Sequence, residues 1–226
     1  MDGTIIVRRF TTNLSLGLKA AGRHNSAGFS LVELLVSMVV TLIILGGAIG
    51  IFTNQLASGR YQSSRADAIT SAQAAINILS REIGNSGYGL KRGILASNGL
   101  VLADCNAARL HFRANINNLN ATTSDPGEDI TFYFDEASQS IVRYDEAGAG
   151  SSAGIINQVS LVNFRYFDYA SNGTFSEVST PTDNTARITI KLTVLLAADE
   201  NVNSPRNVTV ESDIALRNSR YGVGQY

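Results

Sequence analysis

The longest apolar stretch of the chain extends from Phe29 to Phe52 and contains one formally charged side chain, that of Glu33. A helix needs about 20 apolar residues to cross the hydrocarbon core of a bilayer. The apolar core of a secretory signal peptide is shorter, about 7–15 residues, and a small-residue cleavage site follows it. The length of this stretch therefore predicts a membrane-spanning helix over residues 29–52.

Beyond Phe52 the chain becomes more polar but keeps helical spacing. No proline occurs from Met1 to Asp125, and the glycines of GNSGYG at positions 84–89 are typical of a helix end. We therefore expect one continuous helix from Phe29 to about Ile83, with an amphipathic continuation within residues 53–90. Its apolar stripe recurs at gaps of three and four residues and consists of Ile69, Ala72, Ile76, Leu79 and Ile83.

After Gly99 the pattern changes to period two, which is typical of half-buried strands. Segments rich in Gly, Ser, Asn and Asp, at 115–128, 148–154 and 170–184, are expected to be linkers. The predicted strands are DITFYFD (129–135), SIVRYD (140–145), VSLVNFRYFDY (159–169), ARITIKLTVLLA (186–197) and NVTVESDIAL (207–216), with RLHFRA (109–114) as a weaker candidate.

Alternation of this kind predicts an antiparallel sheet with one covered face, and the apolar stripe of the helix is the expected cover. The predicted fold class is α+β, a long N-terminal helix packed on an antiparallel β-sheet. The expected organisation is a leader (1–28), a spanning helix (29–52), its amphipathic continuation (53–90) and a β-sheet domain (91–226).

Charge sets the expected orientation of the spanning helix. The leader contains Arg8, Arg9, Lys19 and Arg23 against Asp2 alone. Because cytoplasmic flanks are enriched in Lys and Arg, we expect the N-terminus in the cytoplasm and the C-terminal domain on the other side. The formal net charge of the whole chain is −1, so no nucleic-acid partner is expected.

Chemistry-bearing residues are few, with one cysteine and two histidines. We therefore expect neither an enzyme nor a cofactor or metal site. Cys105 cannot form an intrachain disulfide, and an inert free thiol is the expectation. His111, in a predicted strand, is expected to be packed or at the surface. The loop acids Asp125, Glu128 and Asp129 could bind Ca²⁺ through oxygen ligands, but solvated loop acids are the commoner alternative.

The segment GFSLVELLV (28–36) resembles the prepilin processing signature of type IV pilins and pseudopilins. In that family a small residue precedes a cut before Phe, and a glutamate is the fifth residue of the mature chain. Gly28, Phe29 and Glu33 match these positions. The resemblance implies that a prepilin peptidase cuts after Gly28 and methylates the new amine of Phe29. It also implies passage of the subunit from lipid into a helical filament.

Weaker similarities in three further segments indicate which kind of pilin or pseudopilin the chain resembles. ILSREIGNSGYGL (78–90), ITFYFDEASQSIVRYD (130–145) and IALRN (214–218) are similar to segments of PilW-like minor pilins and of the related J-type pseudopilins of type II secretion. A PilW-like minor pilin is the leading interpretation, and a J-type pseudopilin is the close alternative. A membrane-anchored periplasmic enzyme or binding module is the alternative from another class.

The resemblance also implies a location and partners. The protein would wait in the bacterial inner membrane, with its C-terminal domain in the periplasm, and then enter a pilus or pseudopilus. The expected partners are the prepilin peptidase, other minor pilins, the major pilin, the inner-membrane assembly platform and, before assembly, membrane lipid.

Two features of the apolar stretch have alternative interpretations. Glu33 could pair with the cationic amine that processing creates at Phe29 and so set the register of assembly. The pattern from Ser30 to Glu33 also fits a capping box, in which Glu only accepts a terminal N–H. Gly46 and Gly50 form a G-x-x-x-G pair that would allow close helix contact, although glycine is also common in membrane helices.

Overall fold

The computed structural model describes residues 28–90, 98–117, 119, 122–147, 150–196 and 206–224. The chain divides into two compact units, Met1–Phe52 and Thr53–Tyr226, and each unit is described by itself. Most of the predicted leader, including its basic residues, lies outside the described residues.

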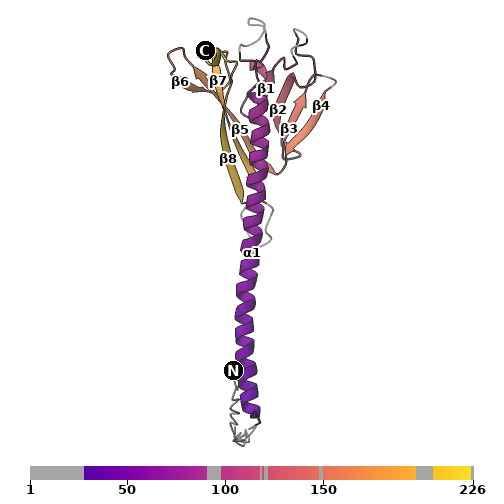
Figure 1. The fold of residues 1–226 in the computed structure, drawn as a ribbon, viewed down its shortest axis with the longest axis vertical. Coiled ribbons are helices and arrows are strands. Elements are labelled where there is room, and N and C mark those ends of the chain that lie inside the picture. The colour runs from indigo at the N-terminus through magenta and orange to yellow at the C-terminus, as the bar shows by residue number, and fades with distance from the viewer. Residues whose placement is uncertain are drawn as a thin grey trace, which may run out of the picture. The chain divides into compact units, whose positions relative to one another are not determined.

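The predicted long helix is confirmed as α1, which extends from Leu31 to Ile83 (Figure 1). Its C-terminal part belongs to the second unit, and there the predicted stripe is largely correct. Ala72, Ala75, Ile76, Leu79 and Ile83 are buried. Ile69 is only half-buried, and Ala68 packs against the core one position earlier. At this end of the stripe Ala68 therefore takes the place that was predicted for Ile69.

Among the residues that the structure describes, eight strands form two antiparallel sheets, where the alternation predicted one. The first sheet has the order β1-β2-β3-β4 and the second β6-β5-β7-β8. The first contains β1 (Arg109–Arg113), β2 (Asp129–Asp135), β3 (Ser140–Asp145) and β4 (Ser151–Ile156), and the second contains β5 (Val159–Tyr169), β6 (Phe175–Val178), β7 (Thr185–Leu195) and β8 (Asn207–Ala215). The described part of the chain also forms two short helices, η1 (Leu102–Asp104) and α2 (Arg220–Val223).

Two of the three expected linkers contain strands. β4 lies in 148–154 and the residues that follow, and β6 lies in 170–184. β4 begins with small residues, SSAG, which are exposed, so no alternation marks it. β6 has four residues, too few to establish a period. Both are edge strands. Their extended conformation comes from pairing with the one adjacent strand and not from a hydrophobic pattern of their own.

A single hydrophobic core joins the C-terminal part of α1 to both sheets. Leu79 and Ile83 of α1 contribute, as do Phe112 and Phe132 from the first sheet. The second sheet contributes alternating residues of two predicted strands: Val162, Phe164 and Tyr166 of β5, and Ile188, Ile190, Leu192 and Val194 of β7. Because each sheet buries one face against the same core, period-two patterning alone cannot distinguish two sheets from one.

The segment before β1 fastens the two sheets together. The Phe134 N–H of the first sheet donates to the Ala108 carbonyl (3.1 Å), and the Phe164 N–H of the second donates to the Ala107 carbonyl (2.8 Å). The Tyr166 hydroxyl donates to the Asn106 carbonyl at 2.8 Å. Backbone groups of neighbouring residues therefore serve both sheets and fix their separation.

The turn after α1 is built around a buried amide. Asn98 is fully buried, and its Nδ2 donates to the carbonyls of Thr182 and Thr185, each at 2.9 Å. The backbone carbonyl of Asn98 accepts from the Ser86 hydroxyl at 2.6 Å. Gly99 follows with φ of +77°, and a Cβ there would lie 2.1 Å from the Gly87 nitrogen. Only glycine fits this close approach of two backbones.

Candidate functional site

The segment with the predicted cleavage site leads directly into α1. Gly28, Phe29 and Ser30 precede Leu31 and are exposed, and 76% of Phe29 is exposed. A Cβ at Gly28 would meet no atom of the described residues within 4 Å. The described side of the junction is thus accessible, and the cut between Gly28 and Phe29 stays a prediction.

Glu33 lies in the first turn of α1 and is exposed. The first helical hydrogen bond runs from the Leu34 N–H to the Ser30 carbonyl, at 3.1 Å. Neither of the two capping-box hydrogen bonds between Ser30 and Glu33 is formed among the residues that the structure describes. The carboxylate is therefore accessible to a group from elsewhere, and both interpretations of Glu33 remain hypotheses for experiment.

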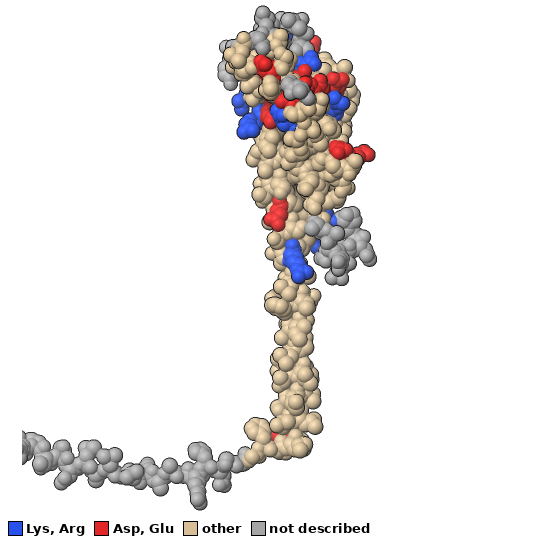
Figure 2. Space-filling model, turned by 90° about the vertical axis from the view of Figure 1, so that its right-hand side faces the viewer, with Lys and Arg blue, Asp and Glu red and all other residues tan. Residues whose placement is uncertain are grey.

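The first part of α1 presents an apolar surface on all sides. The large apolar side chains from Phe29 to Phe52 are between 48% and 81% exposed, and Figure 2 shows this stretch almost wholly without charge. Its hydroxyls bond to their own helix: Ser37 donates to the Leu34 carbonyl at 2.8 Å and Thr41 to the Ser37 carbonyl at 2.7 Å. By length and composition, α1 can cross a membrane.

Three glycines open this apolar surface to close contact. A Cβ added at Gly46, Gly47 or Gly50 would meet no atom within 4 Å. The backbone is therefore uncovered at these positions, as a G-x-x-x-G contact with another helix requires.

A second cluster of polar side chains lies on the first sheet of the second unit. His111 of β1 is 2% exposed. Its Nδ1 is hydrogen-bonded to Asp104 Oδ2 at 2.9 Å and its Nε2 to Asp129 Oδ1 at 2.5 Å. Arg113 Nε donates to the other oxygen of Asp129 at 2.8 Å. When the imidazole is protonated, Asp104, His111, Asp129 and Arg113 form a row in which negative and positive charges alternate.

The cluster shifts the protonation of its members. Burial lowers the pKa of His111, but the hydrogen bonds with Asp129 and Asp104 outweigh burial, and the pKa is raised overall. Burial raises the pKa of Asp129, but its hydrogen bonds with His111 and Arg113 outweigh burial and hold that pKa below the ordinary value. Sequence reasoning placed His111 as a packed or surface residue and missed these partners, because they come from three separate elements.

Cys105 is a free, buried cysteine. Its sulfur accepts from the His111 N–H and donates to the His111 carbonyl, both at 3.3 Å. Burial raises the pKa of this thiol from 9.0 to about 11. A protonated, enclosed thiol is a poor nucleophile, which supports the expectation of an inert cysteine.

The three loop acids considered for Ca²⁺ already serve other groups. Asp129 is bound by His111 and Arg113. Glu128 is 1% exposed and accepts from the backbone N–H groups of Asn117 and Asp125, at 3.2 and 3.3 Å. The geometry therefore favours loop stabilisation over a calcium site made by these three carboxylates.

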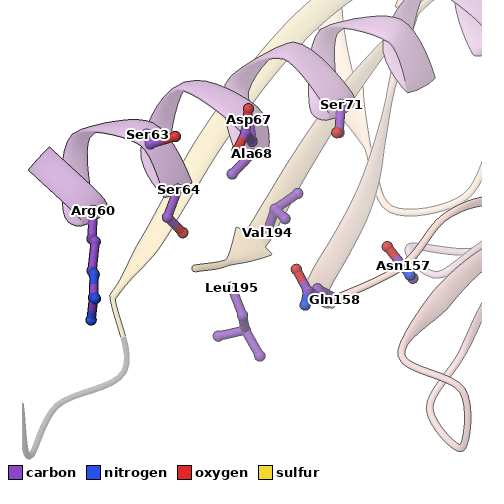
Figure 3. Close-up of a pocket in the computed structure, with 10 residues that line it drawn as sticks. All are labelled: Arg60, Ser63, Ser64, Asp67, Ala68, Ser71, Asn157, Gln158, Val194 and Leu195. Carbon is purple, nitrogen blue, oxygen red and sulfur yellow. The ribbon is translucent and has the colours of Figure 1, made fainter. Parts of the chain in front are cut away.

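A cavity of about 410 Å³ lies within the second unit. Figure 3 shows it between α1, the turn from β4 to β5 and the end of β7. Arg60, Ser64 and Asp67 come from the helix, Gln158 from the turn and Leu195 from β7. This lining combines charged, hydroxyl, amide and apolar side chains and does not define one ligand class.

Residues 23–49 match the family model described as the prokaryotic N-terminal methylation motif. The match includes Gly28, Phe29 and Glu33 and ends within α1. It indicates a type IV pilin-like substrate of prepilin peptidase, and it does not distinguish a PilW-like pilin from a pseudopilin. No curated protein and no solved structure matches the chain.

Proposed function

We propose that this chain is a minor type IV pilin of the PilW-like kind, processed after Gly28, methylated at Phe29 and incorporated into a pilus through residues 29–52. One coincidence carries the proposal. The methylation motif lies at the start of a helix whose first part is apolar and exposed on all sides. A soluble domain has no use for such a surface, whereas a subunit that moves from lipid to a helical bundle needs it in both places.

The helix suits both environments for the same physical reason. In lipid, every polar group must find a partner within the protein, and the hydroxyls of Ser37 and Thr41 bond to carbonyls of their own helix. In a filament, packing replaces lipid contact, and the uncovered glycines at 46, 47 and 50 allow close approach of a second helix.

Glu33 would act after processing. Cleavage frees a cationic amine at Phe29, four residues before Glu33, and N-methylation leaves that amine protonated. Within the apolar centre of a filament an isolated carboxylate is costly, so each subunit would gain from placing Glu33 against the amine of a neighbour. Such a pair would select one axial register.

Mass spectrometry tests the processing step. Intact protein from the native membrane should begin at Phe29 and contain one added methyl group. Gly28→Ala keeps a small residue and should still be cut, whereas Gly28→Leu should retain residues 1–28. A wild-type chain that keeps its leader in cells with active prepilin peptidase would overturn the proposal.

Glu33→Gln tests the assembly step. A capping box tolerates Gln, because its amide oxygen still accepts an N–H, but a charge pair does not. The variant should insert, be cut and fold normally, yet be depleted from sheared filaments of a complemented deletion strain. Glu33→Asp, which keeps the charge, is the matched control. Normal incorporation of the Gln variant would favour the cap.

A J-type pseudopilin shares the same motif and helix, and the same strain separates the two. Loss of surface pili on deletion supports the pilin assignment. Loss of type II secretion with normal pili would replace it with the pseudopilin.

A further inference from the structure

Three side chains with metal-binding atoms converge on the first sheet. His111 of β1, Asp129 of β2 and Glu146, just after β3, offer ligand atoms that lie within 4.8 Å of one another. The core residues Leu110, Phe112 and Ile130 alternate with His111 and Asp129 along their strands, so the side chains of His111 and Asp129 share the face that is turned away from the core. The Glu146 N–H donates to the Asp129 carbonyl at 2.8 Å, which holds these two residues side by side.

Two of the three groups are already oriented by outer partners. Asp104 is hydrogen-bonded to Nδ1 of His111 at 2.9 Å, and Arg113 donates to Oδ2 of Asp129 at 2.8 Å. The atoms left facing each other are Nε2 of His111 and Oδ1 of Asp129, 2.5 Å apart. A carboxylate on the far nitrogen of a histidine, and a donor on the second oxygen of an aspartate, form the usual outer shell of a metal site.

The charge of the cluster also matches a divalent cation. Asp104, Asp129 and Glu146 contribute three negative charges, and Arg113 contributes one positive charge. With a neutral imidazole, as a metal requires, the sum is −2.

A buried oxygen next to the cluster lacks a partner. Thr131 is 1% exposed and pairs with His111 across β1 and β2. Its Oγ1 has no hydrogen-bond partner among the residues that the structure describes. A bound water or ion is one of the explanations for a buried hydroxyl without a partner. This observation is independent of the three ligand groups and points to the same face of the sheet.

We infer that His111, Asp129 and Glu146 bind a divalent transition-metal ion, with zinc as the best match. Zinc takes nitrogen and carboxylate oxygen at about 2.0–2.2 Å, commonly with three protein ligands and a water. An ion bound tetrahedrally to Nε2 and Oδ1 would separate these atoms to about 3.3 Å and replace the proton between them. Calcium prefers six to eight oxygen ligands, which one imidazole and two carboxylates do not supply.

Such an ion would connect β1, β2 and the end of β3, and through Asp104 also η1. This link between strands does not depend on the proposed role in a pilus. The three ligands are separated by 17 or 18 positions along the chain, so no short motif announces them.

Isothermal titration of the full-length chain in detergent, purified without a histidine tag and treated with a chelator, tests the inference. Zinc should bind saturably with a stoichiometry of one, and calcium should not displace it. Glu146→Gln should weaken zinc binding at least about tenfold. Glu136→Gln, the same change at an exposed turn position, should bind like the wild type.

A spectroscopic measurement identifies the nitrogen ligand without perturbing the buried cluster. Cu²⁺ serves as the probe, in a His24→Gln background that leaves His111 as the one histidine of the chain. Pulsed electron paramagnetic resonance should show modulation from the remote nitrogen of one imidazole. Absence of saturable zinc binding, equal affinity in the two Gln variants, or a copper spectrum without imidazole nitrogen would each overturn the inference.

Discussion

Leu79→Ala tests how the helix is fastened to the two sheets. Leu79 is 0% exposed and lies in the core that joins α1 to both sheets. The change removes three carbon atoms, which corresponds to about 2.4 kcal/mol of transfer free energy at about 0.8 kcal/mol each. A residual cavity adds to this cost, so the free energy of unfolding should fall by about 3–4 kcal/mol, within the range for buried Leu→Ala changes.

Ile69→Ala is the matched control, because it removes the same number of carbons from the same helix. The hydrophobic stripe predicted both positions, but Ile69 is only half-buried and leaves no closed cavity when truncated. Its cost should be about 1 kcal/mol.

Urea unfolding of the processed chain in a mild detergent, followed by tyrosine fluorescence and near-ultraviolet circular dichroism, measures both changes. The chain has 8 Tyr and no Trp, so tyrosine is the intrinsic probe. Equal costs for the two variants, or a change at Leu79 below about 0.5 kcal/mol, would refute the packing of α1 on the sheets.

Two further predictions concern single residues of the second unit. Burial raises the pKa of Cys105 from 9.0 to about 11, so the stability that its neutral thiol provides is present below pH 9 and is lost between pH 9 and 11. The free energy of unfolding in urea should therefore fall across this range, and it should fall less in Cys105→Ala. Maleimide at pH 8 should label the wild type fully only after unfolding. Gly99→Ala should lower the free energy of unfolding in urea far more than Gly127→Ala. Both glycines have positive φ, but of the two only Gly99 has backbone atoms within 3 Å of the added Cβ. Similar free energies of unfolding for the two variants would contradict the close approach of Gly99 to Gly87.

The extent of α1 could be predicted because its signals are local. An unbroken apolar stretch, an absence of proline and a glycine-rich end together set its bounds within two residues of Leu31 and Ile83. Most strands were found for the same reason, since alternation is visible within a single segment. β4 and β6 were missed because SSAG carries no alternation and four residues establish no period. Their conformation comes from a neighbouring strand that the sequence does not identify.

The two candidate sites, the processing motif and the cluster around His111, also differ in whether their signals are local in the sequence. Gly28, Phe29 and Glu33 lie within six positions, and the apolar stretch follows directly. The motif and its helix can therefore be recognised from one segment of the sequence. The cluster around His111 exists only once strands pair in register: Phe112 opposite Ile130, and His111 opposite Thr131. Counting histidines and cysteines argued against a metal site, but that count ignores that a sheet can place one imidazole beside carboxylates from distant segments. A slip of one residue between β1 and β2 would turn His111 toward the core and Phe112 outward. The apolar alternation of both strands, which fixes this register, therefore also assembles the polar cluster on the opposite face.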